Sequence, residues 1–282
     1  MKVKIILTML IVLAVAGCGS SGKQDAPARE RVAAAFYPLA YAAKELAPPG
    51  TEVDNLTPPG AEPHDLELTA HDVELVRSAD LVLLLGDGFQ PQLEAAAGNG
   101  AHVLRLLDTL GLDRHPNNDP HVWLDPVRYE LIVKRIAVAL HRPHSADRLV
   151  TRLHALDREY RRSLRSCVRH DIVTSHEAFA YLGERYGLRQ IAITGLSPEA
   201  EPTPKRLERV VRLVRTTGAT TIFFETLVSP RIADTVARET GARTAVLDPI
   251  EGLNSTEQKR GASYFSVMRS NLANLRGALG CR

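Results

Sequence analysis

Apolar residues in the first half of the chain fall into short runs separated by helical stripes. The runs typical of strands cover residues 31–36, 52–56, 81–85 and 102–106. The helices expected between them cover residues 38–46, 69–79 and 91–97. The run at 81–85 is unbroken, which favours a strand buried on both faces of a parallel sheet. Elements that alternate at these lengths predict an α/β layer fold.

The second half of the chain repeats this pattern. Its expected strands cover residues 171–174, 189–194, 220–224 and 244–247, and its expected helices cover 203–216, 230–239 and 264–278. The loops at 56–64 and 196–204 also share leucine, a hydroxyl residue, proline and an Ala-Glu-Pro sequence in the same order. We therefore predict two similar α/β lobes, each a mainly parallel sheet flanked by helices.

Two helices are expected between the halves. The first covers residues 127–140, and Pro143 ends it. In the second, residues 145–165, apolar side chains recur at gaps of three and four and form one stripe: Leu149, Leu153, Leu156, Tyr160 and Leu164. A helix of about 20 residues is about 30 Å long, so we interpret it as a rigid strut that joins the lobes. The alternative, a coiled-coil arm, would need a longer stripe. The predicted division is an N-terminal lobe at 31–126, connecting helices at 127–166 and a C-terminal lobe at 167–282.

The first residues have the features of a secretory leader. Lys2 and Lys4 precede an apolar run at 5–16, which is too short to span a membrane. Small residues directly before Cys18 resemble a lipobox, so residues 1–17 are predicted to be a lipoprotein signal peptide and Cys18 the site of lipid attachment. Residues 18–30 lack an apolar pattern and are expected to form a flexible tether. The chain is therefore expected outside the cytoplasm, lipid-anchored to the cell membrane.

Composition narrows the choice of partners. The net charge is +2, so no nucleic-acid partner is indicated, and the arginine-rich segments are interpreted as solvated helix faces. Beyond residue 16 no apolar stretch is long enough to span a membrane. Export permits a disulfide between Cys167 and Cys281, and two buried free thiols are the alternative.

Three histidines and an aspartate lie in loops that follow predicted strands. His121 stands between two Asp-Pro pairs beside Trp123, on a loop that the prolines stiffen. His64, His176 and Asp248 occupy similar loops. In open parallel sheets, ligands bind beyond the carboxyl ends of the strands. Such a setting suits metal ligands or a catalytic base.

Five motifs carry a resemblance to a known family. They are residues 62–64, 119–126, 175–181, 199–202 and 247–249. Together they resemble the zinc/manganese solute-binding lipoproteins of ABC importers over about residues 31–280. The resemblance implies two lobes joined by one long helix, a metal site in the cleft between them, and His64, His121, His176 and Asp248 as the ligands. Two departures are a missing His/Asp/Glu-rich loop before His121 and a shorter connector.

The expected cargo is a divalent transition metal. Three imidazoles and one carboxylate favour Zn²⁺, whereas Mn²⁺ prefers more oxygen ligands and is the alternative. Affinity alone does not exclude nickel or copper as the bound metal. Glu62 and Glu225 are candidates to orient an imidazole N–H, or equally could be surface carboxylates. Binding is expected to fail as the pH falls through about 6–6.5, where histidine protonates.

The resemblance also implies partners and excludes others. The expected partners are an ABC transporter permease and its ATPase, with the membrane reached through the lipid, and the chain itself is expected to be monomeric. A catalytic zinc site would keep one position open for water, whereas Asp248 would close this one, so no enzyme is predicted. A surface adhesin is the other alternative.

Overall fold

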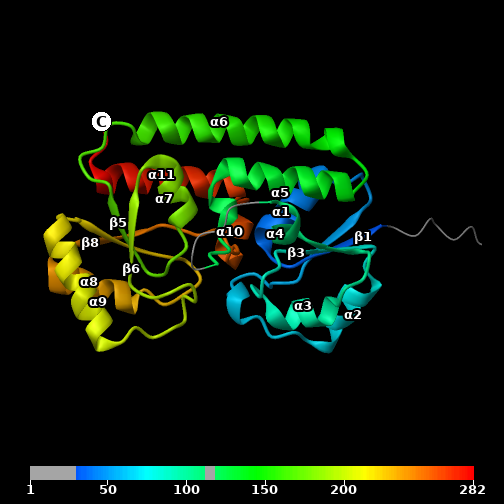
Figure 1. Cartoon of the computed structure of the whole chain (residues 1–282), viewed down its shortest axis with the longest axis horizontal. Helices are drawn as coiled ribbons and strands as arrows, with labels where there is room; N and C mark the ends of the chain where they lie inside the picture. The colour runs from blue at the N-terminus through cyan, green and yellow to red at the C-terminus, as the bar shows by residue number, and fades with distance from the viewer. Residues whose placement is uncertain (1–29, 112–117) are drawn as a thin grey trace, which may run out of the picture.

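The computed structural model describes residues 30–111 and 118–282 of the chain (Figure 1). The predicted signal peptide, Cys18 and the tether up to residue 29 lie outside the described residues, so their assignment stays a prediction.

The N-terminal lobe is built on a parallel sheet with the strand order β2-β1-β3-β4. The strands are β1 (Arg31–Ala34), β2 (Glu52–Asn55), β3 (Leu81–Leu84) and β4 (Val103–Arg105). The helices are α1 (Tyr37–Leu46), α2 (Ala70–Ser78), α3 (Pro91–Ala97) and α4 (Leu106–Thr109). Helix α1 packs on β1 and β2, and α2 and α3 lie together on the opposite side of the sheet (Figure 1). All of β3 is buried, as its unbroken apolar run predicts.

The C-terminal lobe repeats this arrangement with the parallel strand order β6-β5-β7-β8. Its strands are β5 (Asp171–Thr174), β6 (Arg189–Ala192), β7 (Thr221–Phe224) and β8 (Arg243–Val246). Its helices are α7 (Ala180–Tyr186), α8 (Pro204–Thr217), α9 (Arg231–Thr240), α10 (Ser255–Lys259) and α11 (Tyr264–Leu279). In each lobe the first strand along the chain pairs with the second and the third, so the prediction of two similar α/β lobes is confirmed.

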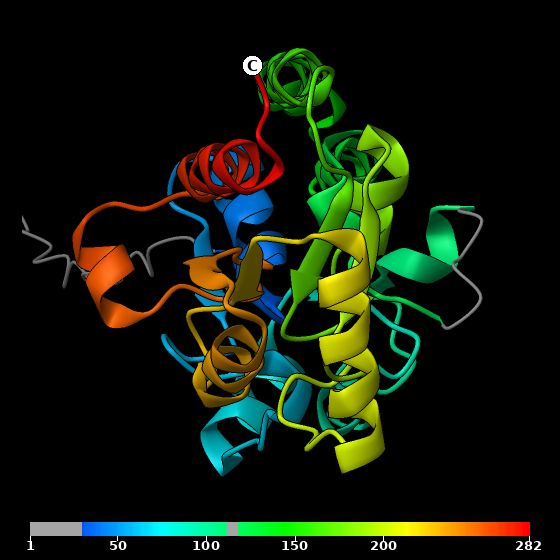
Figure 2. The same cartoon turned by 90° about the vertical axis from the view of Figure 1, so that its left-hand side faces the viewer.

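The long helix between the lobes is α6 (Asp147–Leu164), which follows α5 (Pro126–Ala139). Its buried residues are the five of the predicted stripe: Leu149, Leu153, Leu156, Tyr160 and Leu164. Helix α6 lies over α5 and α11 in both views (Figure 1, Figure 2). Arg152 donates to Glu45 of α1 at 3.1 Å, and the Tyr160 hydroxyl donates to the Met268 carbonyl of α11 at 2.5 Å. The strut therefore contacts both lobes. The division of the chain at residues 126 and 166 stays a prediction.

The two lobes share a hydrophobic core at their junction. The larger core runs from the N-terminal sheet through α5 and α6 to α11, and includes the fully buried rings of Trp123 and Tyr264. A smaller core lies between the C-terminal sheet and helices α8 and α9. Because apolar burial is the main favourable term in folding, the shared core fixes the relative orientation of the lobes.

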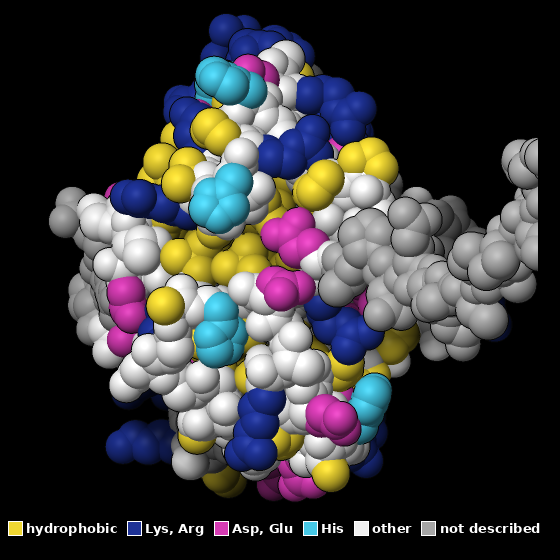
Figure 3. All heavy atoms as spheres, turned by 90° about the vertical axis from the view of Figure 1, so that its right-hand side faces the viewer, with side chains coloured by type: hydrophobic (Ala, Val, Ile, Leu, Met, Phe, Trp, Pro, Cys, Tyr) yellow, Lys and Arg dark blue, Asp and Glu magenta, His cyan; other side chains and the backbone are white. Residues whose placement is uncertain are grey.

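Charged side chains cover the outside of the connecting helices. Figure 3 looks onto the right-hand end of Figure 1 and shows Lys and Arg side chains gathered in its upper part. Lys134, Arg135 and Arg148 are exposed, in agreement with the interpretation of the basic segments as solvated helix faces. Among residues 30–111 and 118–282, no helix is long and apolar enough to cross a membrane.

Cys167 and Cys281 are joined in a disulfide. Cys167 follows α6 and Cys281 follows α11, and the bond links positions 114 residues apart. The cross-link therefore fastens the end of the strut to the end of the last helix.

Removing this disulfide should lower the free energy of unfolding. A cross-link that closes a long loop restricts the unfolded chain, and its loss typically costs about 2–5 kcal/mol. We expect a loss of that size for the double variant Cys167→Ala/Cys281→Ala, measured by urea denaturation of the metal-free protein. Reduced wild-type protein is the control and should unfold at the same urea concentration as the variant. An unchanged midpoint would contradict a stabilising role for the bond.

Candidate metal site

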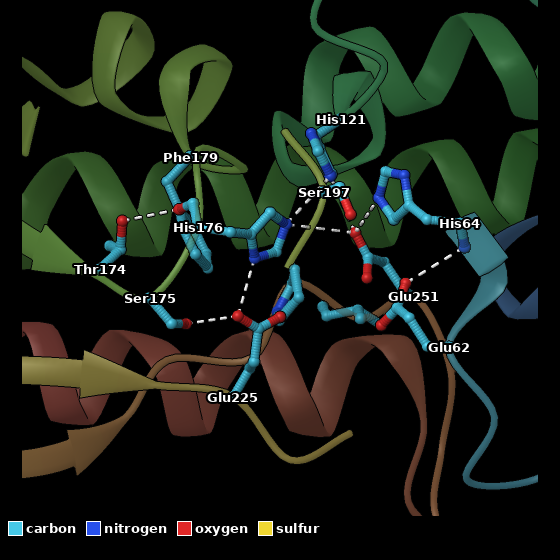
Figure 4. Close-up of polar contacts among 12 residues, drawn as sticks. Glu62, His64, His121, Thr174, Ser175, His176, Phe179, Ser197, Glu225 and Glu251 are labelled. Atoms are coloured by element: carbon cyan, nitrogen blue, oxygen red, sulfur yellow. Dashed lines mark hydrogen bonds and ion pairs between the residues drawn. The ribbon is translucent and has the colours of Figure 1, made fainter. Parts of the chain in front are cut away.

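Three histidines and Glu251 converge where the two lobes meet (Figure 4). Each residue offers one ligand atom, and these atoms all lie within 4.8 Å of one another. Glu251 Oε1 lies 2.8 Å from His121 Nε2, 3.2 Å from His64 Nε2 and 3.5 Å from His176 Nε2. His121 Nε2 and His176 Nε2 are 3.3 Å apart. Side chains at these distances need only small adjustments to surround one cation.

The four residues come from loops that follow strands of both sheets. His64 lies in a one-turn 3-10 helix, Pro63–Asp65, after β2, and His121 lies in the loop after β4 and α4. His176 follows β5, and Glu251 follows β8. The carboxyl ends of parallel strands lie at one edge of each sheet, and these edges face each other across the junction. Each lobe supplies two of the four side chains.

A stiff loop holds His121. Asp119 Oδ1 lies 2.6 Å from His121 Nδ1 and accepts the His121 backbone N–H at 2.9 Å. Asp125 accepts the Val127 N–H at 2.8 Å and so caps α5, which begins at Pro126. The Trp123 ring lies 5.1 Å from the His121 ring. The contact with Asp119 leaves Nε2 as the nitrogen that points to His64, His176 and Glu251.

Glu225 holds His176 in the same way. Its Oε1 lies 2.7 Å from His176 Nδ1 and also accepts the hydroxyl of Ser175 (Figure 4). This is the contact proposed for Glu225 from the sequence. Glu62 lies beside Glu251, but its carboxylate accepts the His64 backbone N–H, at 3.2 Å, as the N-cap of the 3-10 helix. Asp119 is the carboxylate that the sequence analysis missed, although it stands two residues before His121 in the quoted motif.

The structure brings Glu251 together with the three histidines, and not Asp248, which was predicted as the fourth ligand. Asp248 Oδ2 accepts the Thr226 hydroxyl at 2.7 Å, and Oδ1 accepts the Ile250 N–H at 2.7 Å. Ile250 is fully buried with φ of 59°, a left-handed conformation that is costly for a β-branched residue. Asp248 therefore stabilises a strained turn, and this turn directs the next side chain, Glu251, into the junction.

The charges in the group depend on one another. Burial alone raises the pKa of Glu251, but hydrogen bonds from His121, His176 and His64 outweigh it and hold the pKa well below the usual range. Burial alone lowers the pKa of His121 and His176, but Asp119 and Glu225, together with Glu251, outweigh it and raise both values. The metal-free protein therefore binds protons here that a cation must displace.

Two further carboxyl groups at the junction have raised pKa values. Burial, followed by the charge of Glu251, raises the pKa of Glu62 to about 10. Burial raises the pKa of Asp248 to about 7. At pH 7 Glu62 is therefore neutral, whereas Glu251, whose pKa is lowered, is charged.

A cavity of about 280 Å³ leads to His64. Its walls include Phe89 and Pro120 of the first lobe and Leu196 and Ser197 of the second. The His64 side chain is 12% exposed, whereas those of His121, His176 and Glu251 are fully buried. An ion that enters from this cavity meets His64 before the other three side chains.

Exchanging Glu225 for glutamine should weaken metal binding without removing a ligand. The amide accepts the imidazole N–H less strongly than a carboxylate does, and outer partners of this kind are typically worth about 10–100-fold in metal affinity. We expect a loss within that range for zinc, measured by competition with a chelator. Glu239→Gln, an exposed position in the same lobe, is the matched control. Equal affinities of the two variants would argue against a role for Glu225.

The fold and the site define a class of protein. The chain has two similar α/β lobes bridged by one long helix, and both lobes contribute side chains to a site suited to a metal ion. This is the architecture of a two-lobe solute-binding protein. A family model described as "Zinc-uptake complex component A periplasmic" matches residues 32–278. The chain belongs to this family, which confirms the resemblance found in its motifs.

Two relatives illustrate the range of the family. The high-affinity zinc uptake system protein ZnuA of Bacillus subtilis is 32% identical over 301 residues, covering 95% of this chain and 94% of the relative. The zinc-binding protein AdcA of Streptococcus pyogenes is 32% identical over 316 residues. That match covers 98% of this chain, which spans only 61% of the length of AdcA.

Solved structures agree with the fold. The Zn(II)-bound ZnuA-like domain of Streptococcus pneumoniae AdcA is 31% identical with a TM-score of 0.75, covering 89% of this chain and 99% of the domain. The laminin-binding protein Lmb of Streptococcus agalactiae, described as a bifunctional protein with adhesin and metal-transporting activity, is 30% identical. Its TM-score is 0.77, with 89% of this chain and 99% of Lmb covered.

Proposed function

We propose that this chain binds Zn²⁺ outside the cytoplasm and delivers it to an ABC permease driven by its ATPase. The observation that carries the proposal is the buried convergence of His64, His121, His176 and Glu251, which we take as the four ligands. Family membership and the zinc-named relatives support the same cargo. Lipid attachment at Cys18, a monomeric state and the absence of catalysis belong to this proposal.

The donor set favours zinc over manganese. Three imidazole nitrogens and one carboxylate oxygen match the four-coordinate sites that Zn²⁺ prefers, whereas Mn²⁺ prefers more oxygen ligands. A hydrolytic zinc site would keep one position free for water beside a general base. Glu251 contacts all three imidazoles and supplies the fourth ligand, which supports a carrier rather than a hydrolase.

The similarity to Lmb does not by itself support an adhesive function for this chain. The likeness to Lmb extends over the same two lobes as the likeness to the zinc-bound AdcA domain, so it does not separate an adhesin from a carrier.

Titration of the metal-free protein tests the cargo. We expect one Zn²⁺ per chain, and zinc should displace Mn²⁺ from the same site. Failure to bind one equivalent of zinc, or tighter binding of manganese, would contradict the assignment.

Delivery is tested in the organism that encodes the chain. A strain lacking the gene should grow poorly under zinc chelation and recover when zinc is added. The wild-type gene should restore growth, and a gene that encodes His121→Ala should not. Equal rescue by both genes would separate the phenotype from metal binding.

A further inference from the structure

The loop that carries His121 is tied at both ends to a helix of the other lobe. We define the His121 loop as residues 119–125. At its first residue, the Asp119 carbonyl accepts the Tyr181 hydroxyl at 3.1 Å. At its last residue, Asp125 Oδ1 lies 3.0 Å from Arg185 Nε. Tyr181 and Arg185 are one helical turn apart on α7, so one face of a C-terminal helix holds both ends of an N-terminal loop.

Trp123 ties the middle of the His121 loop to the same lobe. Its indole N–H donates to the Pro249 carbonyl at 2.7 Å, two residues before Glu251. Its own carbonyl accepts the Tyr264 hydroxyl of α11 at 2.7 Å. The Trp123 ring also packs on Phe36 of the first lobe, at 4.8 Å between ring centres. The His121 loop is therefore fastened from both sides of the junction.

The segment that carries His64 is held differently. Its base is fixed to its own lobe, where the Thr57 hydroxyl donates to the Ala35 carbonyl at 2.7 Å. Across the junction the Gly60 N–H donates to the Leu253 carbonyl at 3.2 Å, and His64 itself contacts Glu251. Of the four converging side chains, that of His64 is the one with exposed surface, and it faces the cavity of about 280 Å³.

We propose that Tyr181 and Arg185 are positioning residues for His121, so that His121, His176 and Glu251 form a preassembled set that His64 completes. The proposal rests on the proposed zinc binding. The contacts that fix the three members relative to one another are formed largely within buried surroundings: Tyr181 is fully buried, and Asp119 and Asp125 are 3% and 4% exposed. Loss of a partner there leaves a buried polar group unsatisfied and lets the loop move.

The arginine serves the strut as well as the loop. Arg185 Nε lies 2.7 Å from Asp157 Oδ1 of α6, and the Tyr186 hydroxyl donates to the same oxygen at 3.1 Å. One guanidinium therefore links α7, the long helix and the His121 loop. This geometry couples the position of His121 to the docking of the C-terminal lobe on the strut.

The test compares Tyr181→Phe, Arg185→Met and Arg185→Lys with wild-type protein and His121→Ala. Arg189→Met is the matched control. Arg189 pairs with Asp171 at 2.9 Å in the same lobe, at the start of β5, whereas His176 follows the end of that strand. We expect roughly tenfold weaker zinc binding for Tyr181→Phe and Arg185→Met, the scale of an outer-partner effect, and partial recovery in Arg185→Lys. Arg189→Met should bind as wild type does.

Two readouts separate positioning from general stability. The absorption spectrum of the Co²⁺-loaded protein reports ligand geometry and should change in Tyr181→Phe and Arg185→Met but not in Arg189→Met. Hydrogen exchange of the metal-free wild-type protein should be slower at residues 118–125 than at residues 60–66. Exchange at 118–125 should rise in Tyr181→Phe and Arg185→Met, and zinc should slow residues 60–66 most.

The outcomes distinguish this proposal from the proposed function. If wild-type protein fails to bind zinc, the proposed function fails. The positioning proposal fails alone if wild-type protein binds zinc and His121→Ala loses binding, while Tyr181→Phe and Arg185→Met keep wild-type affinity and spectrum. Faster exchange at 118–125 than at 60–66 in metal-free wild-type protein would overturn the preassembled set. Should Arg185→Met not fold, Tyr181→Phe and Arg185→Lys decide.

Discussion

Exchanging Glu251 for glutamine should lower zinc affinity by more than about a hundredfold. Replacing a residue that only hydrogen-bonds to a metal ligand typically lowers metal affinity by about 10–100-fold, and Glu251 is itself a proposed ligand. Its Oε1 lies within 3.5 Å of all three imidazoles. Glutamine keeps the shape of the side chain but removes the negative charge that balances the cation. Competition with a chelator measures the change, and thermal unfolding of the metal-free variant checks the fold.

Asp248→Asn is the informative comparison. Asparagine keeps an acceptor for the Ile250 N–H, so the strained turn should persist and zinc affinity should fall only about tenfold, as for an outer partner. The order of the two losses distinguishes a ligand from a residue that holds a turn. A larger loss in Asp248→Asn than in Glu251→Gln would restore Asp248 as the ligand and overturn our reading of the site.

Much of the fold could be predicted because its signals are local. The apolar run at 81–85 by itself predicts a buried strand. The stripe from Leu149 to Leu164 by itself predicts that α6 packs along one face. The similarity of the halves followed from repeated strands and from matching loops. The strand order, identical in the two sheets, agrees with that inference.

The three histidines could be predicted because each directly follows a strand or stands in a proline-stiffened loop. Parallel strands place such loops at one edge, so distant histidines meet without any further information. The carboxylate was different. Asp248 and Glu251 both follow the last strand, and the sequence does not show which of them faces the other lobe.

The choice between them depends on contacts that are distant in sequence. Asn271 of α11 accepts the Asp248 N–H at 2.9 Å and donates to its carbonyl at 2.7 Å. These bonds fix Asp248 on its own lobe, and the left-handed Ile250 then turns the chain. Asp119, by contrast, was within reach of the sequence analysis, since an aspartate two residues before a histidine can accept both its backbone and its ring N–H.

Zinc affinity should fall steeply with acidity, beginning above the pH at which an ordinary histidine protonates. Asp119, Glu225 and Glu251 raise the pKa of His121 and His176, so the metal-free protein holds these protons above pH 6.5. Each proton that zinc displaces costs about tenfold in affinity per pH unit, and two cost about a hundredfold. The loss expected from sequence at about pH 6–6.5 is therefore shifted upward. Chelator competition between about pH 6 and pH 8.5 measures the slope.

The stability of the metal-free protein should have the opposite pH dependence. A histidine whose pKa is raised by folding stabilises the folded state fully below its unfolded pKa of about 6.5, and this contribution disappears as the pH rises through the folded pKa. Glu251, whose pKa is lowered, contributes above about pH 4.5 and ceases to contribute as the pH falls through its folded value. The unfolding temperature of metal-free protein should therefore decline above about pH 6.5, while the increase produced by zinc should grow. If zinc affinity did not change between about pH 6 and pH 8.5, or changed by less than tenfold per pH unit, zinc would displace fewer than one proton. That result would show that the histidines are neutral before the metal binds.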